Sequence, residues 1–252
     1  MRFFALILLG ASNFAFAHEL QSITQHLDIK RQNETAWQQD LIYRHDIDRK
    51  WQVGVQGTYL ERFDLYEKRA GVIGVYRPSE LWTFEARFLQ GMGNEILPEK
   101  ETSLMAYHST MVGISPFFGV KDLRYSNTTV DTLNIGVEIE RIEGIILIPS
   151  ITYGMAKFKD PNETKNIYTL GLRAAYYQEG KFLTSIYGYT GKEASQGIIG
   201  SASELISTLT GGASFEWIFS EAFRGEVLVD HTNYKQLKNQ FITSTLNLRW
   251  TF

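Results

Sequence analysis

The chain has no cysteine, few prolines and little net charge. Its 252 residues include five prolines and no cysteine, and the formal net charge is −3. Without cysteine, no disulfide stabilises the fold. Past the first residues, no apolar run approaches the roughly 20 residues of a transmembrane helix, and no basic stripe indicates a nucleic-acid partner. These absences exclude a disulfide scaffold and argue against a helical membrane protein and a nucleic-acid-binding protein.

The first 17 residues have the pattern of a secretory signal peptide. MRFFALILLGASNFAFA carries one basic residue, Arg2, an apolar run over Phe3–Leu9, and small residues at Ala15 and Ala17. This pattern predicts cleavage after Ala17, so that residues 18–252 form the mature domain. A membrane anchor is the alternative, but the apolar run is much shorter than a membrane-spanning helix.

Apolar and polar residues alternate along most of the remaining chain. The clearest stretches are DTLNIGVEIERI (Asp131–Ile142), WTFEARF (Trp82–Phe88) and KWQVGVQGTYL (Lys50–Leu60). A period of two residues is typical of strands with two unlike faces. We predict an all-β chain of about fourteen strands, with twelve as the alternative. The strands are expected near 22–32, 36–46, 50–62, 67–77, 81–91, 102–115, 117–126, 130–141, 145–157, 166–177, 181–190, 205–218, 223–232 and 241–252.

Short and longer connections alternate between these strands. Every second connection is tight, including SPF (Ser115–Phe117), whereas most of the others are longer and more polar. Two connections, near Asn33–Thr35 and Phe63–Tyr66, are shorter than this rule predicts. The alternation is typical of transmembrane antiparallel up-and-down β-barrels with periplasmic turns and extracellular loops. A secreted β-sandwich, the soluble alternative, gives no reason for it. We therefore expect a barrel in the bacterial outer membrane.

Aromatic residues are predicted to gather at two levels of this barrel. If both chain ends are periplasmic, Trp51, Trp82, Trp217 and Trp250 fall at the periplasmic interface, where amphipathic rings are favoured. Phe117 is expected at the same level. An outer ring is expected from Tyr59, Phe88, Tyr125, Tyr153, Tyr168 and Tyr189.

The final residues, STLNLRWTF, alternate like a strand that closes against the first one. On this interpretation Arg249 faces the lumen. Leu246, Leu248, Trp250 and Phe252 face lipid and resemble the C-terminal signal of outer-membrane barrels, which the barrel assembly machinery reads.

The chain also resembles the YaiO family of outer-membrane β-barrels. The similarity lies in aromatic, glycine and turn motifs spread over most of the mature chain. The resemblance implies an outer-membrane location and, as in some members, an association with surface-polysaccharide systems. It supplies no catalytic residues. The matching segments are Gly57–Phe88, Ile96–Pro98, Ser185–Glu193, Ser214–Phe223 and the closing strand.

Charged residues of both signs are predicted on the lumen face. They form either a structural web of ion pairs or the wall of a conduit that tunes which solutes pass. Eight strands enclose a filled core and sixteen leave a channel, so a width of fourteen strands leaves both open. The candidate lumen-lining residues are Glu85, Arg87, Glu138, Glu140, Arg173, Arg224, Glu226, Asp230 and Arg249.

No pattern of catalytic or metal-binding residues stands out. The histidines do not converge in spacing as metal ligands do, so no cofactor or metal is predicted. A surface lipid hydrolase needs a serine beside a histidine. His108 and Ser109 point to opposite faces of one strand, and His231 has no serine two residues on. A pair across two strands is not excluded by the sequence.

Three functions are therefore carried forward. The first is a non-enzymatic barrel of the YaiO type that passes polar solutes or serves surface-polysaccharide export. The second is an outer-membrane lipid hydrolase or deacylase. The third is a structural barrel whose outer loops bind a ligand. The expected partners are outer-membrane lipid and lipopolysaccharide, the barrel assembly machinery and polysaccharide-export components.

Overall fold

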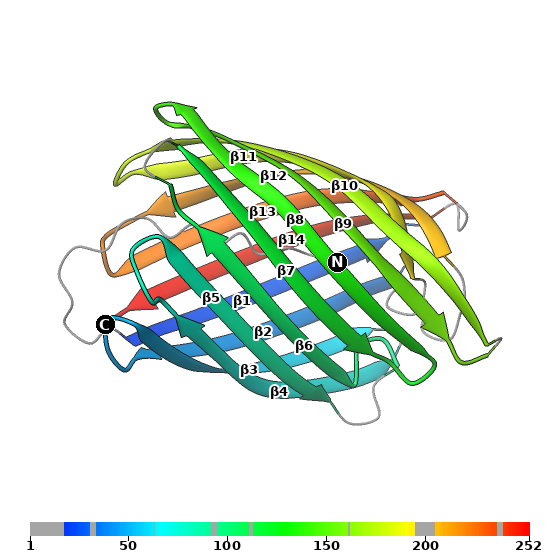
Figure 1. Ribbon diagram of the computed structural model, residues 1–252. Helices are drawn as coiled ribbons and strands as arrows, with labels where there is room; N and C mark the ends of the chain where they lie inside the picture. The colour runs from blue at the N-terminus through cyan, green and yellow to red at the C-terminus, as the bar shows by residue number, and fades with distance from the viewer. Residues whose placement is uncertain are drawn as a thin grey trace.

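The computed structural model is a closed antiparallel β-barrel (Figure 1). It describes residues 18–30, 34–62, 64–91, 95–110, 113–160, 162–194, 205–235 and 239–252, with the side chains of 193, 194 and 239 left aside. The predicted signal peptide, residues 1–17, lies outside the described residues. Each strand pairs with its chain neighbours, and β1 pairs with β14 to close the sheet. The prediction of fourteen strands in an up-and-down barrel is confirmed, and the twelve-strand alternative is wrong.

The strands are long enough to cross a bilayer when tilted. They are β1 (His18–Ile29), β2 (Glu34–Asp46), β3 (Trp51–Arg62), β4 (Leu65–Tyr76), β5 (Trp82–Gly91), β6 (Lys100–His108), β7 (Ile114–Arg124), β8 (Thr128–Ile142), β9 (Ile145–Phe158), β10 (Glu163–Gln178), β11 (Phe182–Ala194), β12 (Leu205–Ile218), β13 (Phe223–Tyr234) and β14 (Asn239–Thr251).

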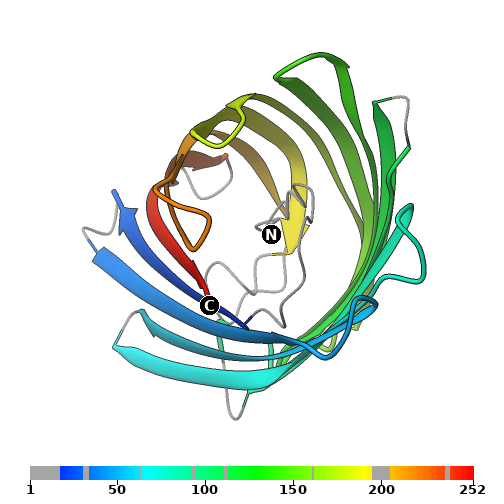
Figure 2. The same ribbon diagram turned by 90° about the vertical axis from the view of Figure 1, so that its left-hand side faces the viewer.

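Because β1 and β14 are hydrogen-bonded to each other, the barrel has no exposed strand edge. The amide of His18 donates to the carbonyl of Phe252 at 2.8 Å, and the amide of Phe252 donates back at 2.8 Å. The view in Figure 2 shows the ring of strands around the lumen. In a bilayer, backbone groups have no water to bond, so complete closure is what makes a sheet able to cross it.

The two rims of the barrel carry different connections. His18 and Phe252 lie at one rim, together with the two-residue turn Glu143–Gly144, where Gly144 adopts a positive φ of 81°. We refer to this end as the short-turn rim. At the opposite rim, the longest breaks between consecutive strands separate Gly91 from Lys100 and Ala194 from Leu205. Residues 195–204, predicted as the longest outer connection, lie outside the described residues.

One predicted turn is wrong. Strand β6 already ends at His108, and β7 begins at Ile114, so Ser115–Phe117 lies inside β7 instead of forming a tight turn. Pro116 pairs only with Val137 of β8, one position beyond the last β6 pair, and the start of a strand is where a proline without an N–H is tolerated.

The position predicted for Phe117 is wrong for the same reason. Phe117 was expected at the membrane interface, but its ring covers Gly136 of β8, where an added Cβ would lie 2.3 Å from Cζ. It pairs with Tyr107, which lines the lumen.

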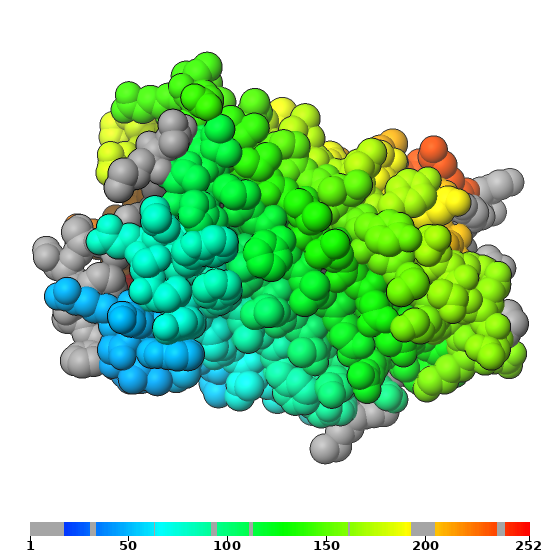
Figure 3. Space-filling view, in the orientation of Figure 1, coloured from blue at the N-terminus to red at the C-terminus, as the bar shows by residue number. Residues whose placement is uncertain are grey.

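Each strand separates an apolar outer face from a polar inner one. On β8, Leu133 and Ile135 are 40% and 49% exposed on the outside, whereas Asn134 between them is 4% exposed on the inside. Figure 3 shows the closely packed outer surface over β6 to β9. No helix among the described residues is long and apolar enough to cross a bilayer. An apolar outer wall facing hydrocarbon and a polar lumen are what the alternation predicted.

Candidate functional site in the barrel lumen

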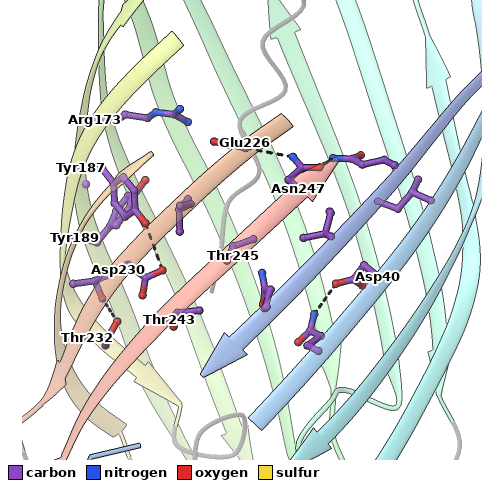
Figure 4. Close-up of a pocket in the computed structure, with 18 of the residues that line it drawn as sticks. Asp40, Arg173, Tyr187, Tyr189, Glu226, Asp230, Thr232, Thr243, Thr245 and Asn247 are labelled. Atoms are coloured by element: carbon purple, nitrogen blue, oxygen red, sulfur yellow. Dashed lines mark hydrogen bonds between the residues drawn. The ribbon is translucent and has the colours of Figure 1, made fainter. Parts of the chain in front are cut away.

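The lumen contains a cavity of about 500 Å³. Side chains from every side of the barrel line it, most of them polar or charged (Figure 4). Seven of the predicted lumen charges stand on its wall: Glu85, Arg87, Arg173, Arg224, Glu226, Asp230 and Arg249. The other two, Glu138 and Glu140, are not part of its lining, and Glu140 accepts a hydrogen bond from Tyr177.

On the wall formed by β4 to β7, the charged side chains are paired with one another. Glu101 is bound on both oxygens, by Arg69 Nη1 at 2.6 Å and by Lys121 Nζ at 2.7 Å. Its side chain is only 6% exposed. Next to this group, Arg87 Nη2 donates to Glu85 Oε1 at 3.0 Å. A buried carboxylate needs such partners, so this cluster ties three strands together.

A second carboxylate on the same wall holds a loop in the lumen. Glu67 on β4 accepts the backbone N–H groups of Glu95, Ile96 and Leu97 at 2.6, 2.8 and 2.6 Å. Ile96 and Leu97 are buried against Leu60 and line the cavity. Bonds from several amides to an ionised carboxylate are strong, so the loop after β5 narrows the lumen at a fixed position.

The wall around β2 and β3 is also hydrogen-bonded to itself. Asp40 accepts from Thr58 Oγ1 at 2.5 Å, from Gln38 Nε2 at 2.8 Å and from Gln56 Nε2 at 3.1 Å. Asp40 is 3% exposed, so these three donors satisfy a carboxylate that little water can reach.

The wall formed by β10 to β13 is different, because one of the cations that line it, Arg173 of β10, has no such partner. Arg173 makes no hydrogen bond or ion pair with another described residue, and its Nε has no acceptor. It points into the cavity beside Tyr187 and Tyr189 (Figure 4). The Tyr187 hydroxyl donates to Asp230 Oδ2 at 3.4 Å. The prediction that Tyr189 belongs to the outer aromatic ring is wrong, because its face of β11 turns inward.

Several lumen residues were not singled out from the sequence. Arg69, Glu101 and Lys121 lie at inward positions of alternating strands, so the same period of two would have found them. Glu67 has no such signal for its role, since its partners are backbone amides of a loop. Tyr187 and Tyr189 were missed because an alternating tyrosine fits either a membrane interface or a lumen.

The predicted interface tryptophans lie near the short-turn rim. Trp51 stacks on Tyr76 with ring centroids 4.3 Å apart, and Trp250 stacks on Phe223 at 5.2 Å. Trp217 is 43% exposed on the outer face, and Trp82 packs edge-on against His108. Leu246, Leu248, Trp250 and Phe252 occupy alternate positions along the outer face of β14 and the residue that follows it.

The strand register shows where a histidine and a serine on different strands stand next to each other. His26 of β1 stands opposite Ser244 of β14 on the outer face, and its ring packs edge-on against Trp37 at 4.9 Å. No hydrogen bond joins His26 to Ser244. Among the described residues, no three His, Asp or Glu side chains form a group that could hold a metal ion.

Known structures share this architecture but not its sequence. No family model matches the chain, and no curated protein matches it. A loop-deletion variant of OmpT, an outer-membrane protein of Vibrio cholerae, superposes with a TM-score of 0.56 at 7% identity, over 94% of this chain and 99% of that one. The in-vitro folded OmpT gives 0.53 at 8% identity, over 98% and 100%.

The chain has the fold of an outer-membrane β-barrel. Identity this low shows the fold and nothing about the solute. The closed ladder and the apolar outer face independently require a bilayer around the barrel. Together they assign the protein to the bacterial outer membrane.

Proposed function

We propose that the protein is a non-enzymatic conduit for polar solutes across the outer membrane. The observation that supports this most directly is the cavity of about 500 Å³ with polar and charged residues on its wall. A structural barrel could satisfy every inward charge locally, as Glu101 is satisfied. The polar groups on β10 to β13 that remain open to the cavity favour solute passage.

The finer assignment is a barrel of the YaiO type that serves a surface-polysaccharide system. It is supported by the resemblance in Gly57–Phe88 and Ile96–Pro98, the second of which belongs to the loop that narrows the lumen. Lipopolysaccharide would surround the part of the barrel that lies in the outer leaflet. The alternate apolar residues from Leu246 to Phe252 would be the signal for the barrel assembly machinery.

Electrical recording in planar bilayers tests the conduit. The refolded barrel in KCl is expected to insert with steady, stepwise conductance. A heat-unfolded sample in the same detergent is the control and should give no steps. A correctly folded barrel, identified by its heat-modifiable mobility in gels, that inserts but stays electrically silent would reject the conduit.

A lipid hydrolase is a second candidate because of His26 and Ser244. Trp37 beside His26 marks the membrane interface, the depth at which lipid ester bonds lie. If this pair were catalytic, the barrel would release fatty acid from phospholipid vesicles, and Ser244→Ala would abolish the release. Ser109→Ala, next to His108 and remote in register, is the matched control. No release by the wild-type barrel would reject this candidate.

A further inference from the structure

Two tyrosines of β11 lie against the lumen side of the neighbouring strands β10 and β12. Tyr189 stands opposite Gly171 of β10, and Tyr187 stands opposite Gly212 of β12. A Cβ added at Gly171 would lie 2.4 Å from Tyr189 Cδ1, and one at Gly212 would lie 2.5 Å from Tyr187 Cζ. The glycines therefore let each ring rest directly on the backbone. The ring centroids are 5.4 Å apart, and both partly exposed rings line the cavity.

Hydrogen-bonding groups of both kinds border these rings. Arg173 stands directly opposite Tyr187 in the ladder of β10 and β11, and it makes no hydrogen bond with another described residue. A guanidinium offers five N–H donors. On the other side, Asp230 of β13 faces Gly212 and is 7% exposed. Its Oδ2 accepts from Tyr187, and its Oδ1 accepts no hydrogen bond from another described residue. The site thus offers donors at one end, acceptors at the other and aromatic faces between them.

The charges near Arg173 decide which solute fits. Glu138 and Glu216 both interact electrostatically with it, and Glu216 also interacts with Arg224 and Arg249. Arg224, Arg249, Glu226 and Asp230 face the same cavity, so charges of both signs surround the site. A solute carboxylate placed on Arg173 would meet the nearby carboxylates, and a solute cation would meet the guanidinium groups. An apolar solute would leave the polar border unsatisfied. A sugar ring instead presents hydroxyls that donate and accept, and C–H faces that pack on aromatic rings.

We propose that Arg173, Tyr187, Tyr189 and Asp230 form a binding subsite for an uncharged saccharide ring inside the lumen. This rests on the proposed conduit function, which it deepens by naming the class of solute. The tyrosines give the sugar a surface to stack on, Arg173 donates to its oxygens and Asp230 accepts from its hydroxyls. Such a contact slows the sugar in the lumen without trapping it.

Saturation-transfer NMR on the folded barrel tests the subsite without depending on conductance. The detergent is lauryldimethylamine oxide, which carries no sugar. The probes are cellotriose and triglucuronate, which share linkage and length and differ in the C6 carboxylates. Cellotriose is expected to receive saturation, strongest on its ring C–H protons, and triglucuronate much less. No transfer to cellotriose, or stronger transfer to triglucuronate, would overturn the proposal.

Three variants connect the signal to the subsite. Tyr189→Ala is expected to reduce the cellotriose signal at least fivefold, and Arg173→Gln at least threefold. Tyr107→Leu, which removes a cavity tyrosine from the wall of β6, is the matched control and should leave the signal unchanged. Equal losses in all three variants would show non-specific contact with the lumen and overturn the subsite. Gel mobility after heating confirms that each variant is folded.

Recording in bilayers separates this proposal from the conduit. Cellotriose added to a conducting barrel is expected to produce brief current interruptions that Tyr189→Ala removes. Steady conductance without interruptions, together with no saturation transfer, would overturn the subsite and leave the conduit intact. A silent barrel that still binds cellotriose would reject the conduit and support the subsite.

Discussion

The two sides of the lumen use charged residues in opposite ways. On β4 to β7, Glu101 is shared by Arg69 and Lys121, and Glu67 is bound by three backbone amides. On β10 to β13, Arg173 has no hydrogen-bond acceptor among the described residues, and the aromatic rings beside it are partly exposed to the cavity. The first wall satisfies its charges within the protein, whereas the second leaves Arg173 without a hydrogen-bond partner among the described residues.

This difference separates structural from functional charges in a barrel. Inward orientation alone does not distinguish them, because both walls present charges to the lumen. The distinguishing property is whether the protein itself supplies the partner. Variants on the neutralised wall should therefore change stability, and variants on the open wall should change what the lumen binds or conducts.

The largest effect is expected from Glu101→Gln. It leaves Arg69 and Lys121 without their shared carboxylate. Breaking a buried ion pair costs about 3 kcal/mol or more. We expect the free energy of unfolding to fall by about that amount, measured by tryptophan fluorescence in urea with lipid vesicles. Lys121 retains 26% exposure, which favours the low end of the range.

The control for this variant is an exposed ion pair. Glu163→Gln removes a partner that lies 3.0 Å from Lys165, with side chains 48% and 30% exposed. Exposed pairs contribute up to about 1 kcal/mol, so this variant should lose at most about a third as much. Equal losses at the two sites would contradict the idea of a structural wall on β4 to β7.

The variant Glu67→Leu is expected to lose less stability than Glu101→Gln and to change the single-channel current. It removes the acceptor for three amides, and we expect a loss of about 2 kcal/mol in the free energy of unfolding. The loop that carries Ile96 and Leu97 would no longer be held, so the single-channel conductance should rise. Glu67→Gln, which keeps one acceptor oxygen, should be intermediate. Unchanged conductance in both variants would mean that this loop does not narrow the path.

The smallest effect on stability is expected from Arg173→Gln. No hydrogen bond is lost, only the electrostatic interactions with Glu138 and Glu216, so the free energy of unfolding should change by no more than about 1 kcal/mol. The lumen loses a positive charge, so the reversal potential in a KCl gradient should shift towards greater cation preference. A loss of stability as large as that of Glu101→Gln would show that the two walls do not differ.

The period of two residues was sufficient to predict the faces of many strand residues, although not the face of Tyr189. It oriented Glu85 and Arg87 inwards and Leu133 and Ile135 outwards, because alternate residues of a membrane strand face the lumen and the lipid. It was not sufficient at Ser115–Phe117, where a proline inside a strand has the same signature as a turn.

Contacts between strands could not be predicted, because they depend on register. Alternation gives each of Arg69, Glu101 and Lys121 a face, but only the ladder brings Arg69 and Lys121 within 3 Å of Glu101. Register likewise decides that His26 stands opposite Ser244. The capture of residues 95–97 by Glu67 involves backbone amides, which every residue but proline has, so no side-chain pattern indicates it.

The most direct test of the whole account is spin-label accessibility in lipid vesicles. The chain has no cysteine, so single cysteines at Leu209, Thr210, Leu246 and Asn247 can each carry a nitroxide without a background signal. The account predicts that labels at Leu209 and Leu246 relax with oxygen dissolved in lipid, and that labels at Thr210 and Asn247 relax with a water-soluble nickel complex. If all four labels responded to the nickel complex alike, or none at the inward positions did, a water-filled barrel in lipid would be contradicted.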